Sequence, residues 1–213
     1  SGFSVISAWI YIQSGSVQEE VSILNIGESS TYAHDFFLYT EDSSTTPMAL
    51  GCKIGDDTNY VLWRTKKNVL KQEKWHHVAV KSVANGLGVG IFIDGKKTTT
   101  ISAENTGPAA YNPSPLTGTI GNVSGTWDRT FNGYIDEVSL YARSLLASDI
   151  QKIYNGGQPK GINEQTEYLK NKVVSHWTMG DGDDSDPDIL DVIAENHATM
   201  SSFVSPYGII SNS

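Results

Sequence analysis

Hydrophobic and polar residues alternate with a period of two along much of the chain. The pattern is clear from Phe3 to Ile12, a run rich in β-branched and aromatic residues that ends at Ser14-Gly15-Ser16. Strands have this period because successive side chains point to opposite faces of a sheet. The same reasoning predicts further strands at Val21–Ile26, Asp35–Thr40, Met48–Lys53, Tyr60–Arg64, His76–Ser82, Val89–Asp94, Leu116–Asn122 and Tyr134–Tyr141.

Turn residues separate these strands. Asp94-Gly95 lies between Ile91-Phe92-Ile93 and Lys96–Thr100, and Asp-Gly between two strand runs is a strong signal for a tight hairpin. Many short strands joined by turns are typical of an all-β protein in which two antiparallel sheets form a sandwich or barrel.

One helix is predicted near the end of the strand-rich part. Ser148–Tyr154 places Ile150, Ile153 and Tyr154 on one helical face, with Ser148 as the expected N-cap and Asn155-Gly156-Gly157 as the stop. The chain is therefore divided into a sandwich at 1–157, a linker at 158–172 and a C-terminal extension at 173–213.

Composition excludes several function classes. The net charge is −9, and no cluster of lysine and arginine is large enough to bind nucleic acid. No segment approaches the roughly 20 apolar residues that a membrane span requires. The single cysteine, Cys52, is expected to be a buried small side chain, and it rules out an internal disulfide.

Three segments resemble the laminin-G-like, concanavalin A-like lectin family. Phe3–Ile10 is similar to the family's early F-S-x-S-A-W strand. Trp75-His76-His77-Val78-Ala79-Val80 and Ile91–Lys96 resemble its W-H-H-V-A-V and Y-I-D-G pair, and Phe131–Tyr141 resembles its closing F-x-G-x-I-D-E-V-x-I-Y. The resemblance implies a two-sheet antiparallel jelly roll. It does not imply one function, because this fold carries lectins, enzymes, adhesion modules and virion parts.

The C-terminal extension carries a second resemblance. A segment similar to W-x-M-G-D-G lies within Val174–Gly182. The aspartate that follows such a motif lies within Ile189–Asp191, and a segment similar to N-x-G-T-M lies within Glu195–Met200. Such segments accompany laminin-G-like domains in structural proteins of tailed bacteriophages, marine ones especially. We expect Val173–Met200 to complete this sandwich or to donate a strand to a neighbouring subunit, because an unpaired sheet edge must be covered.

The charged and aromatic residues of the strands favour structural roles. Asp136 and Glu137 are the nearest candidates for a glycosidase pair, but adjacent strand residues face opposite sides, so Glu137 is expected at a surface. His76 and His77 are also expected on opposite faces, where they are poor joint ligands for a metal. Trp9 and Trp75 are expected to be core or sheet-packing aromatics. The chain is therefore predicted not to be an enzyme.

Two candidate binding sites remain. Sugar binding needs aromatic side chains with polar neighbours on a loop or concave face, and the candidates are Trp127, Asp128, Trp63 and Tyr111. Calcium binding needs hard oxygen ligands, which an acidic run offers at Asp181, Asp183, Asp184, Asp186 and Asp188, with Asp191 beyond it. A solvated acidic loop is the alternative for this run.

The sequence thus predicts a non-catalytic structural or decoration protein of a virion surface. Its partners would be other virion or surface subunits and cell-surface glycans, with assembly or adhesion as its role and calcium as its one candidate cofactor. A secreted carbohydrate-binding or cell-adhesion module is the alternative, with an extracellular location. A glycoside hydrolase is the remote alternative.

Overall fold

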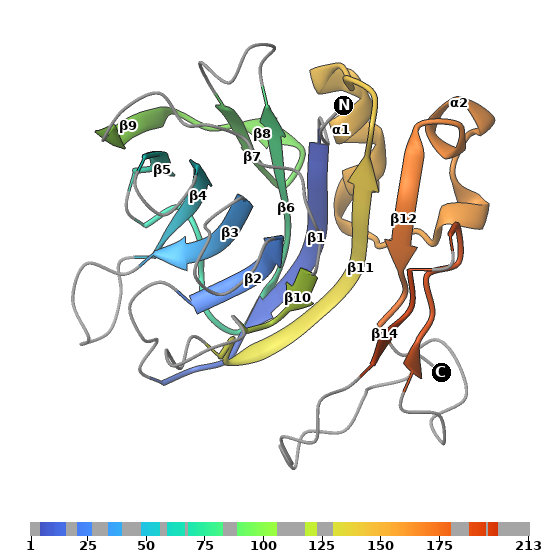
Figure 1. Ribbon diagram of the computed structural model, residues 1–213, viewed down its shortest axis with the longest axis horizontal. Coiled ribbons are helices and arrows are strands. Elements are labelled where there is room, and N and C mark those ends of the chain that lie inside the picture. The colour runs from blue at the N-terminus through green and yellow to red at the C-terminus, as the bar shows by residue number, and fades with distance from the viewer. Residues whose placement is uncertain are drawn as a thin grey trace.

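The protein is a two-sheet antiparallel sandwich of the jelly-roll type, seen here in a computed structural model (Figure 1). The structure describes residues 5–15, 21–26, 34–39, 48–55, 59–66, 68–82, 89–105, 118–122, 130–179, 188–194 and 196–199. Side chains at 34–39, 55, 82, 101–105, 188 and 199 are outside this description.

The first sheet, sheet A, contains both ends of the sandwich sequence. Its strands, in spatial order, are β12 (Val173–Trp177), β11 (Gly133–Tyr141), β1 (Val5–Ile12), β6 (Trp75–Ser82), β7 (Val89–Ile93) and β8 (Lys96–Lys97). β1 lies near the centre and pairs antiparallel with both β11 and β6. The predicted C-terminal strand forms the edge, since β12 pairs antiparallel with β11.

The second sheet, sheet B, is built from the middle of the chain. Its strands, in spatial order, are β10 (Gly118–Ile120), β2 (Val21–Ile26), β3 (His34–Tyr39), β4 (Ala49–Gly55), β5 (Tyr60–Thr65) and β9 (Thr100–Asn105). Their ladders are antiparallel. A separate two-stranded ladder joins β13 (Asp188–Ile189) to β14 (Ala198–Thr199).

The predicted strands are found with end shifts of a few residues. The exception is β9, which the sequence pattern missed. The Asp94-Gly95 hairpin forms with both residues at positive φ, 50° and 73°, but its second strand stops at Lys97. The chain then crosses from sheet A to the edge of sheet B, where Thr100–Asn105 pairs with β5. A polar edge strand carries too weak an alternation to show this crossing.

The main hydrophobic core fills the space between the two sheets. Sheet A contributes inward-facing residues such as Ile10, Val78 and Val138, and sheet B contributes residues such as Ile23 and Leu50. Cys52 is part of this core and is buried, as predicted. At about 25 cal/mol per Å² of apolar surface, each large side chain buried here contributes roughly 2 kcal/mol.

A helical layer covers part of the outer face of sheet A. It consists of α1 (Ala147–Tyr154), the 3₁₀ turns Asn155–Gly157 and Ile162–Glu164, and α2 (Glu167–Lys170), so the expected linker is partly helical. Figure 1 shows both helices beside one end of β1, β11 and β12. Their apolar residues form a second core with the outer side chains of the sheet: Val5, Ala79, Phe92, Tyr141, Leu145, Ile150, Ile153, Ile162, Leu169 and Val173.

The start of α1 differs from the prediction. The helix begins at Ala147 with Leu146 as N-cap, so Ser148 lies inside the first turn and does not cap it. The Asp149 carboxylate accepts the N–H of Leu146 at 3.0 Å, which satisfies a donor at the helix start in place of a serine cap. The predicted stop is confirmed, because Asn155 takes the left-handed conformation at the C-cap.

The position of α1 also depends on Gly95. A Cβ atom there would lie 2.9 Å from Cδ1 of Tyr154, the last residue of α1. The glycine therefore serves the hairpin turn and the helix contact at once. No helix in the described part of the chain is long and apolar enough to cross a membrane.

His77 is expected to make the stability of the protein fall as the pH drops below 6.5. Its ring packs against both Trp9 and Tyr154, and burial lowers its pKa from 6.5 to about 4 despite the opposing charge of Asp94. The unfolded chain therefore takes up a proton near pH 6.5 that the folded protein takes up only near pH 4. Acidification across this range should cost up to about 3 kcal/mol of unfolding free energy, at about 1.4 kcal/mol per pH unit.

Urea unfolding of the wild type and of His77→Leu between pH 7 and pH 4 tests this. The variant should lose most of the pH dependence in that window, whatever its absolute stability. Equal pH dependence in the two proteins would contradict the assignment to His77.

Candidate functional site

Three aromatic side chains form an exposed cluster on the outer face of sheet A. Tyr11, Trp75 and Tyr134 lie on β1, β6 and β11 and face one another through direct strand pairing. Their ring centroids are 5.7 Å apart for Tyr11–Trp75, 5.6 Å for Tyr11–Tyr134 and 6.4 Å for Trp75–Tyr134. Trp75 is 39% exposed, so of its two expected roles, core or sheet packing, it has the second. We call these three residues the aromatic cradle.

The cradle is exposed because the helical layer stops short of it. Two residues further along β1 and β6, Trp9 and His77 are buried, and Tyr154 of α1 stacks on Trp9 with centroids 5.8 Å apart. Tyr11 is the one residue of β1 that is not fully buried. The outer face is thus a continuous aromatic surface of which α1 covers one end and leaves the other open.

Polar groups lie at the margin of the cradle. Gln13 donates from Nε2 to the Tyr134 hydroxyl at 3.3 Å, and Gln72 donates to the carbonyl of Gly15 at 2.9 Å. The loop before Trp75 is held against the end of β1 by the N–H of Glu73, which donates to the carbonyl of Ile12 at 2.8 Å. Aromatic rings with polar neighbours on a solvent-facing surface are suited to ligands that have both apolar and hydroxylated faces.

A β-bulge changes the orientation of the two carboxylates predicted to face opposite sides. The ladder between β1 and β11 shifts between Ser7 and Trp9, and Glu137 has a positive φ of 49°. Ile135 and Val138 both pack in the inner core, so Asp136 and Glu137 between them both lie toward the outer face. The alternation rule fails here because a bulge inserts one extra residue into the strand.

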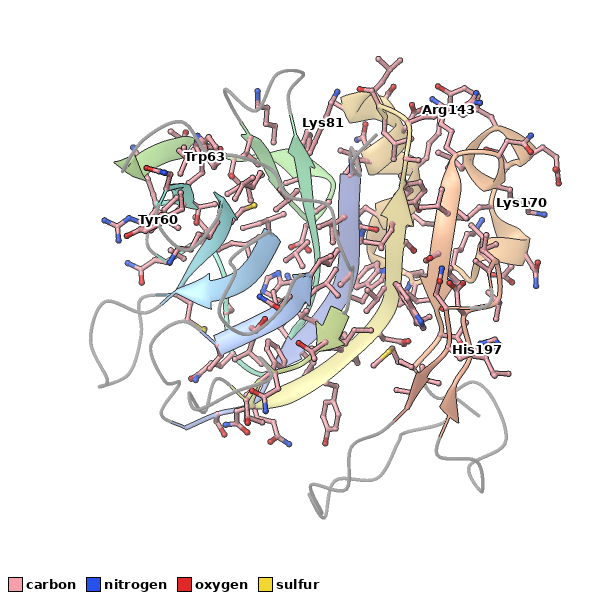
Figure 2. All side chains as sticks on the ribbon, viewed as in Figure 1. Tyr60, Trp63, Lys81, Arg143, Lys170 and His197 are labelled. Carbon is pink, nitrogen blue, oxygen red and sulfur yellow. The ribbon has the colours of Figure 1, made fainter. Side chains whose placement is uncertain are left out.

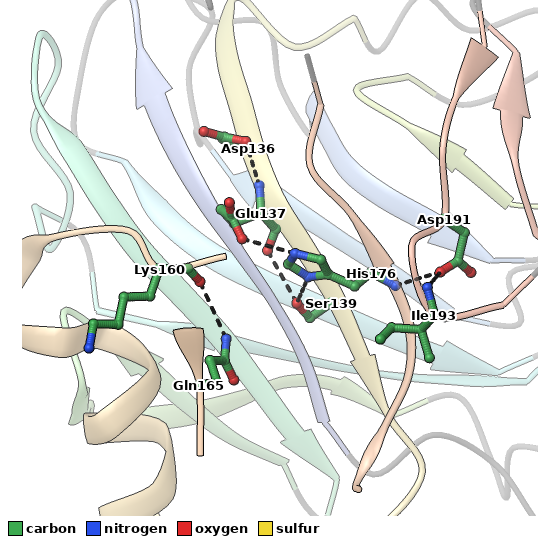
Figure 3. Close-up of polar contacts among 8 residues, drawn as sticks. All are labelled: Asp136, Glu137, Ser139, Lys160, Gln165, His176, Asp191 and Ile193. Carbon is green, nitrogen blue, oxygen red and sulfur yellow. Dashed lines mark hydrogen bonds and ion pairs between the residues drawn. The ribbon is translucent and has the colours of Figure 1, made fainter. Parts of the chain in front are cut away.

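Glu137 is buried and paired, and the expectation that it lies at a surface is wrong. Its Oε2 is 3.0 Å from Nε2 of His176 on β12, and the Nδ1 of His176 is 2.7 Å from the Ser139 hydroxyl (Figure 3). Ser139, His176 and Glu137 are 2%, 1% and 8% exposed. A serine, a histidine and a carboxylate are the groups of a nucleophilic triad, but here the two ring nitrogens have exchanged partners and burial keeps a substrate from the serine. The arrangement instead fastens β12 to β11.

The C-terminal segment is tied to β12 by its own polar groups. Asp191 Oδ1 accepts the N–H groups of His176, Ile193 and Ala194 at 3.0, 3.0 and 3.1 Å. Burial raises the pKa of Asp191, but these hydrogen bonds outweigh it and hold the pKa below its usual range. The indole N–H of Trp177 donates to the carbonyl of Asn196 at 2.9 Å. Residues of the second sequence resemblance therefore hold the β13–β14 ladder beside the sandwich.

His76 has a comparable structural role in the hairpin between β7 and β8. Its Nε2 accepts the N–H of Lys71 at 3.1 Å, so its Nδ1 is the nitrogen that donates to Asp94 Oδ2 at 2.9 Å. Burial raises the pKa of Asp94, whereas the hydrogen bonds from His76 and from the His77 N–H, with the charge of Lys74, lower it overall. These contacts occupy both ring nitrogens and leave none for a metal.

The predicted sugar-binding residues are only partly placed. Trp63 lies on β5, near β9 (Figure 2). It is 7% exposed and belongs to the inner core, so its ring offers no open face to a sugar. Tyr111, Trp127 and Asp128 lie outside the described residues.

The calcium prediction also falls largely outside the described chain. Asp181, Asp183, Asp184 and Asp186 are not among the described residues, and Asp188 is described only as backbone in β13. Asp191 is described, and its Oδ1 already accepts three N–H groups. Within the described ranges, no three acidic, histidine or cysteine side chains are grouped to hold a metal ion. Calcium binding by the acidic run stays a prediction.

Sequence reasoning missed the aromatic cradle because its members are far apart in the chain. The sequence pattern identifies Tyr11 and Tyr134 only as parts of strands, and Trp75 as a core or sheet-packing aromatic. The available signal was the register of the sheet. When β6 and β11 are aligned as the two neighbours of β1, Tyr11 lies between Trp75 and Tyr134.

The comparisons with known proteins agree with the fold. A laminin-G-type family model, described as the concanavalin A-like lectin/glucanases superfamily, matches residues 1–151. No curated protein sequence matches the chain.

Solved structures share the architecture at low sequence identity. A protein proposed to bind carbohydrate, from Bacteroides ovatus, has a TM-score of 0.62 and 16% identity over 93% of this chain, which spans about half, 52%, of that protein. The CBM40 module of a Ruminococcus gnavus sialidase, bound to α2,3-sialyllactose, has a TM-score of 0.53 and 15% identity over 71% of this chain and 82% of its own. Tailspike protein 2 of an Escherichia coli O157:H7 bacteriophage has a TM-score of 0.54 and 16% identity over 82% of this chain and 23% of its own.

Removal of the Glu137 carboxylate should destabilise the protein by about 2–3 kcal/mol, because Glu137→Ala leaves His176 buried without its partner. Glu167→Ala is the matched control, since the Glu167 side chain is 81% exposed and pairs with Lys170 on the surface. That change should cost less than about 0.5 kcal/mol. Urea unfolding gives both values, and hydrogen exchange should show β12 amides losing protection in Glu137→Ala. Equal small losses in the two variants would contradict the fastening role of the pair.

Proposed function

The chain belongs to the concanavalin A-like lectin/glucanases superfamily, and from this premise we propose that it is a non-catalytic module that binds glycans through the aromatic cradle. The observation that carries the proposal is the exposure of Trp75 beside Tyr11 and Tyr134 on a sheet face that the helical layer covers only in part. A large exposed aromatic on a sheet, where burial is available nearby, is typical of a binding surface.

The sugar-facing chemistry fits binding better than hydrolysis. A glycosidase needs two carboxylates on either side of the scissile bond, one as acid and one as base or nucleophile. Asp136 is the carboxylate nearest the cradle along β11, and its Oδ1 accepts the N–H of Glu137 at 2.8 Å. Glu137 itself is buried against His176. The pair therefore does not present two free carboxylates at one open surface.

Trp75→Ala should reduce glycan affinity at least tenfold, because it removes the most exposed ring of the cradle. The assay is binding of the full chain to a glycan array, followed by calorimetry with the best ligand. Tyr168→Ala is the matched control: Tyr168 is 49% exposed on α2 and lies outside the cradle. Unchanged binding in Trp75→Ala, or equal loss in both variants, would contradict the proposed site.

A second role, in assembly, is favoured by the C-terminal segment. Leu190, Val192 and Ile193 are 52%, 46% and 41% exposed, three aliphatic side chains within four residues of the loop that follows β13. Together with the similarity of the C-terminal motifs to virion proteins, they support display on a virion surface, or on another extracellular surface, with this loop docked on a second copy of the chain.

Replacement of Leu190, Val192 and Ile193 by serine should shift a self-associated form to monomer. Light scattering during gel filtration, over a range of protein concentrations, measures the change. Leu146→Ser is the control, because Leu146 is also exposed, at 63%, but lies at the start of α1. A wild type that stays monomeric at high concentration would rule out this docking.

A further inference from the structure

The turn that leads into Trp75 has a backbone conformation that residues other than glycine rarely adopt. Asn68 and Glu73 have positive φ angles of 64° and 57°, a region that such residues occupy only where other contacts hold them. Leu70 anchors the first part of the turn, because its side chain is 4% exposed and packs in the inner core. We call residues 68–74 the approach loop. Its conformation determines how the chain enters β6 at Trp75.

His76 holds the middle of the approach loop from the opposite face of β6. Successive strand residues point to opposite faces, so the His76 ring lies on the other side of the sheet from Trp75, where it is 3% exposed. The Nε2 of this ring accepts the N–H of Lys71 at 3.1 Å, and its Nδ1 donates to Asp94 Oδ2 at 2.9 Å. A backbone N–H can only donate, so the bond to Lys71 exists only while Nε2 is unprotonated.

Protonation of His76 would replace this acceptor by a second donor. The imidazolium ring carries an N–H at both nitrogens, and the Nε2–H would face the N–H of Lys71. Histidine is the side chain that ordinarily changes charge between about pH 5 and pH 8. Burial raises the pKa of Asp94, but the hydrogen bonds from His76 and the His77 N–H, with the charge of Lys74, hold it below its usual range, so the carboxylate is ionised throughout this interval. Acid therefore strengthens the contact of the ring with Asp94 while it removes the contact with Lys71.

The other groups around the ring do not account for a change in this interval. β1 places the uncharged Ile10 beside His76. Burial lowers the pKa of His77 to about 4, against the charge of Asp94, so its ring is largely neutral above that pH. The remaining charged side chains of the approach loop and of the β7–β8 hairpin are exposed, where solvent and salt screen them: Lys71, Glu73, Lys74, Lys96 and Lys97. Among the described segments that contact its ring, His76 is therefore the group that can couple mild acid to the loop.

We propose that His76 is a positioning residue for the aromatic cradle, and that its protonation weakens glycan binding in mild acid. The inference rests on the proposed glycan-binding function and deepens it by naming its regulation. At neutral pH, the bond between His76 and Lys71 holds the approach loop and so fixes the entry of the chain into Trp75. After protonation, the loop lacks the contact that offsets its positive φ angles. Trp75 then leaves its place beside Tyr11 and Tyr134, and the ring that the glycan contacts is displaced.

Nitrogen-15 NMR of the full chain measures this switch without a sugar. Between about pH 7.5 and pH 5 the amide signal of Lys71 should move upfield, the direction expected when an N–H loses its acceptor, and the indole signal of Trp75 should shift at the same midpoint. Asp94→Asn tests the partner, because asparagine also tolerates the positive φ of this hairpin turn. It should move the midpoint to lower pH, since the carboxylate charge no longer favours the protonated ring. A Lys71 amide that does not respond to pH, or a midpoint unchanged in Asp94→Asn, would overturn the role of His76.

An array of neutral and acidic soluble oligosaccharides, probed with the labelled full chain at both pH values, measures the effect on binding. The apparent affinity of the wild type should fall about fivefold to tenfold in acid, as expected for the loss of one hydrogen bond. His76→Leu should show this loss already at neutral pH. His76→Gln should restore binding and remove its pH dependence, because the side-chain oxygen of glutamine can accept the Lys71 N–H.

His197→Asn is the matched control. The Nδ1 of His197 also accepts a backbone N–H, that of Asp191 at 3.2 Å, but it does so in the C-terminal segment. This variant should keep the pH dependence of the wild type. Loss of the pH dependence in His197→Asn, or its persistence in His76→Gln, would assign the effect to another group and overturn the inference.

The outcomes separate the inference from the function on which it rests. Glycan binding that is lost in Trp75→Ala but equal at the two pH values would overturn the inference and leave the cradle as a glycan site. Absence of binding to every oligosaccharide at either pH, with the Lys71 amide still titrating, would overturn the proposed function and leave His76 as the group that positions Trp75.

Discussion

Both faces of β1 must be covered, and most of the structure follows from this constraint. Ile6, Ala8, Ile10 and Ile12 face sheet B, while Val5, Ser7 and Trp9 face the other way and are equally buried. A strand that is apolar on two sides needs a layer on each. The chain supplies the second layer with α1 and the segment around α2, which return over sheet A after β11. On the side of the sheet that carries the aromatic cradle, the last residue of this layer is Tyr154, and the cradle lies beyond it.

The bulge at Glu137 allows β11 to hold the C-terminal strand β12. By adding a residue to β11, it turns Glu137 toward His176 on β12, and the Ser139 hydroxyl completes the buried polar group. A buried polar group of this kind is costly unless its members are paired, so the position of β12 becomes specific. The edge strand in turn carries Trp177 and the N–H of His176, which hold the Asn196 and Asp191 segment. The C-terminal motifs are thus tied to β11 through β12, by these hydrogen bonds and by the ion pair of Glu137 and His176.

The cradle lies on strands, whereas the sequence pattern favoured sugar-binding candidates in loops, such as Trp127. It lies on three neighbouring strands, whose backbones are held by ladders on both sides, and not on turns. The glycan site that we propose there would lose little conformational entropy on binding, because its strands are already held in place. The fold shared with the Bacteroides, Ruminococcus and bacteriophage proteins provides this frame, while the chemistry of the site belongs to the side chains of this chain.

The alternation of residues determined the strands, the Asp94-Gly95 hairpin, the stop of α1 and the sandwich class, because each depends on local backbone preference or on one buried face. Tertiary structure decided which side chains are buried and which way they point, because both depend on strand register and on the layers that cover each sheet. Trp63 and Trp75 are both strand tryptophans, yet one is in the core and the other in solvent. The alternation of Asp136 and Glu137 failed because a bulge is decided by the neighbouring strands, not by the residues themselves. Local sequence specifies which residues prefer burial. Only the packed chain determines which of them another layer covers, because coverage depends on segments that are distant in the sequence.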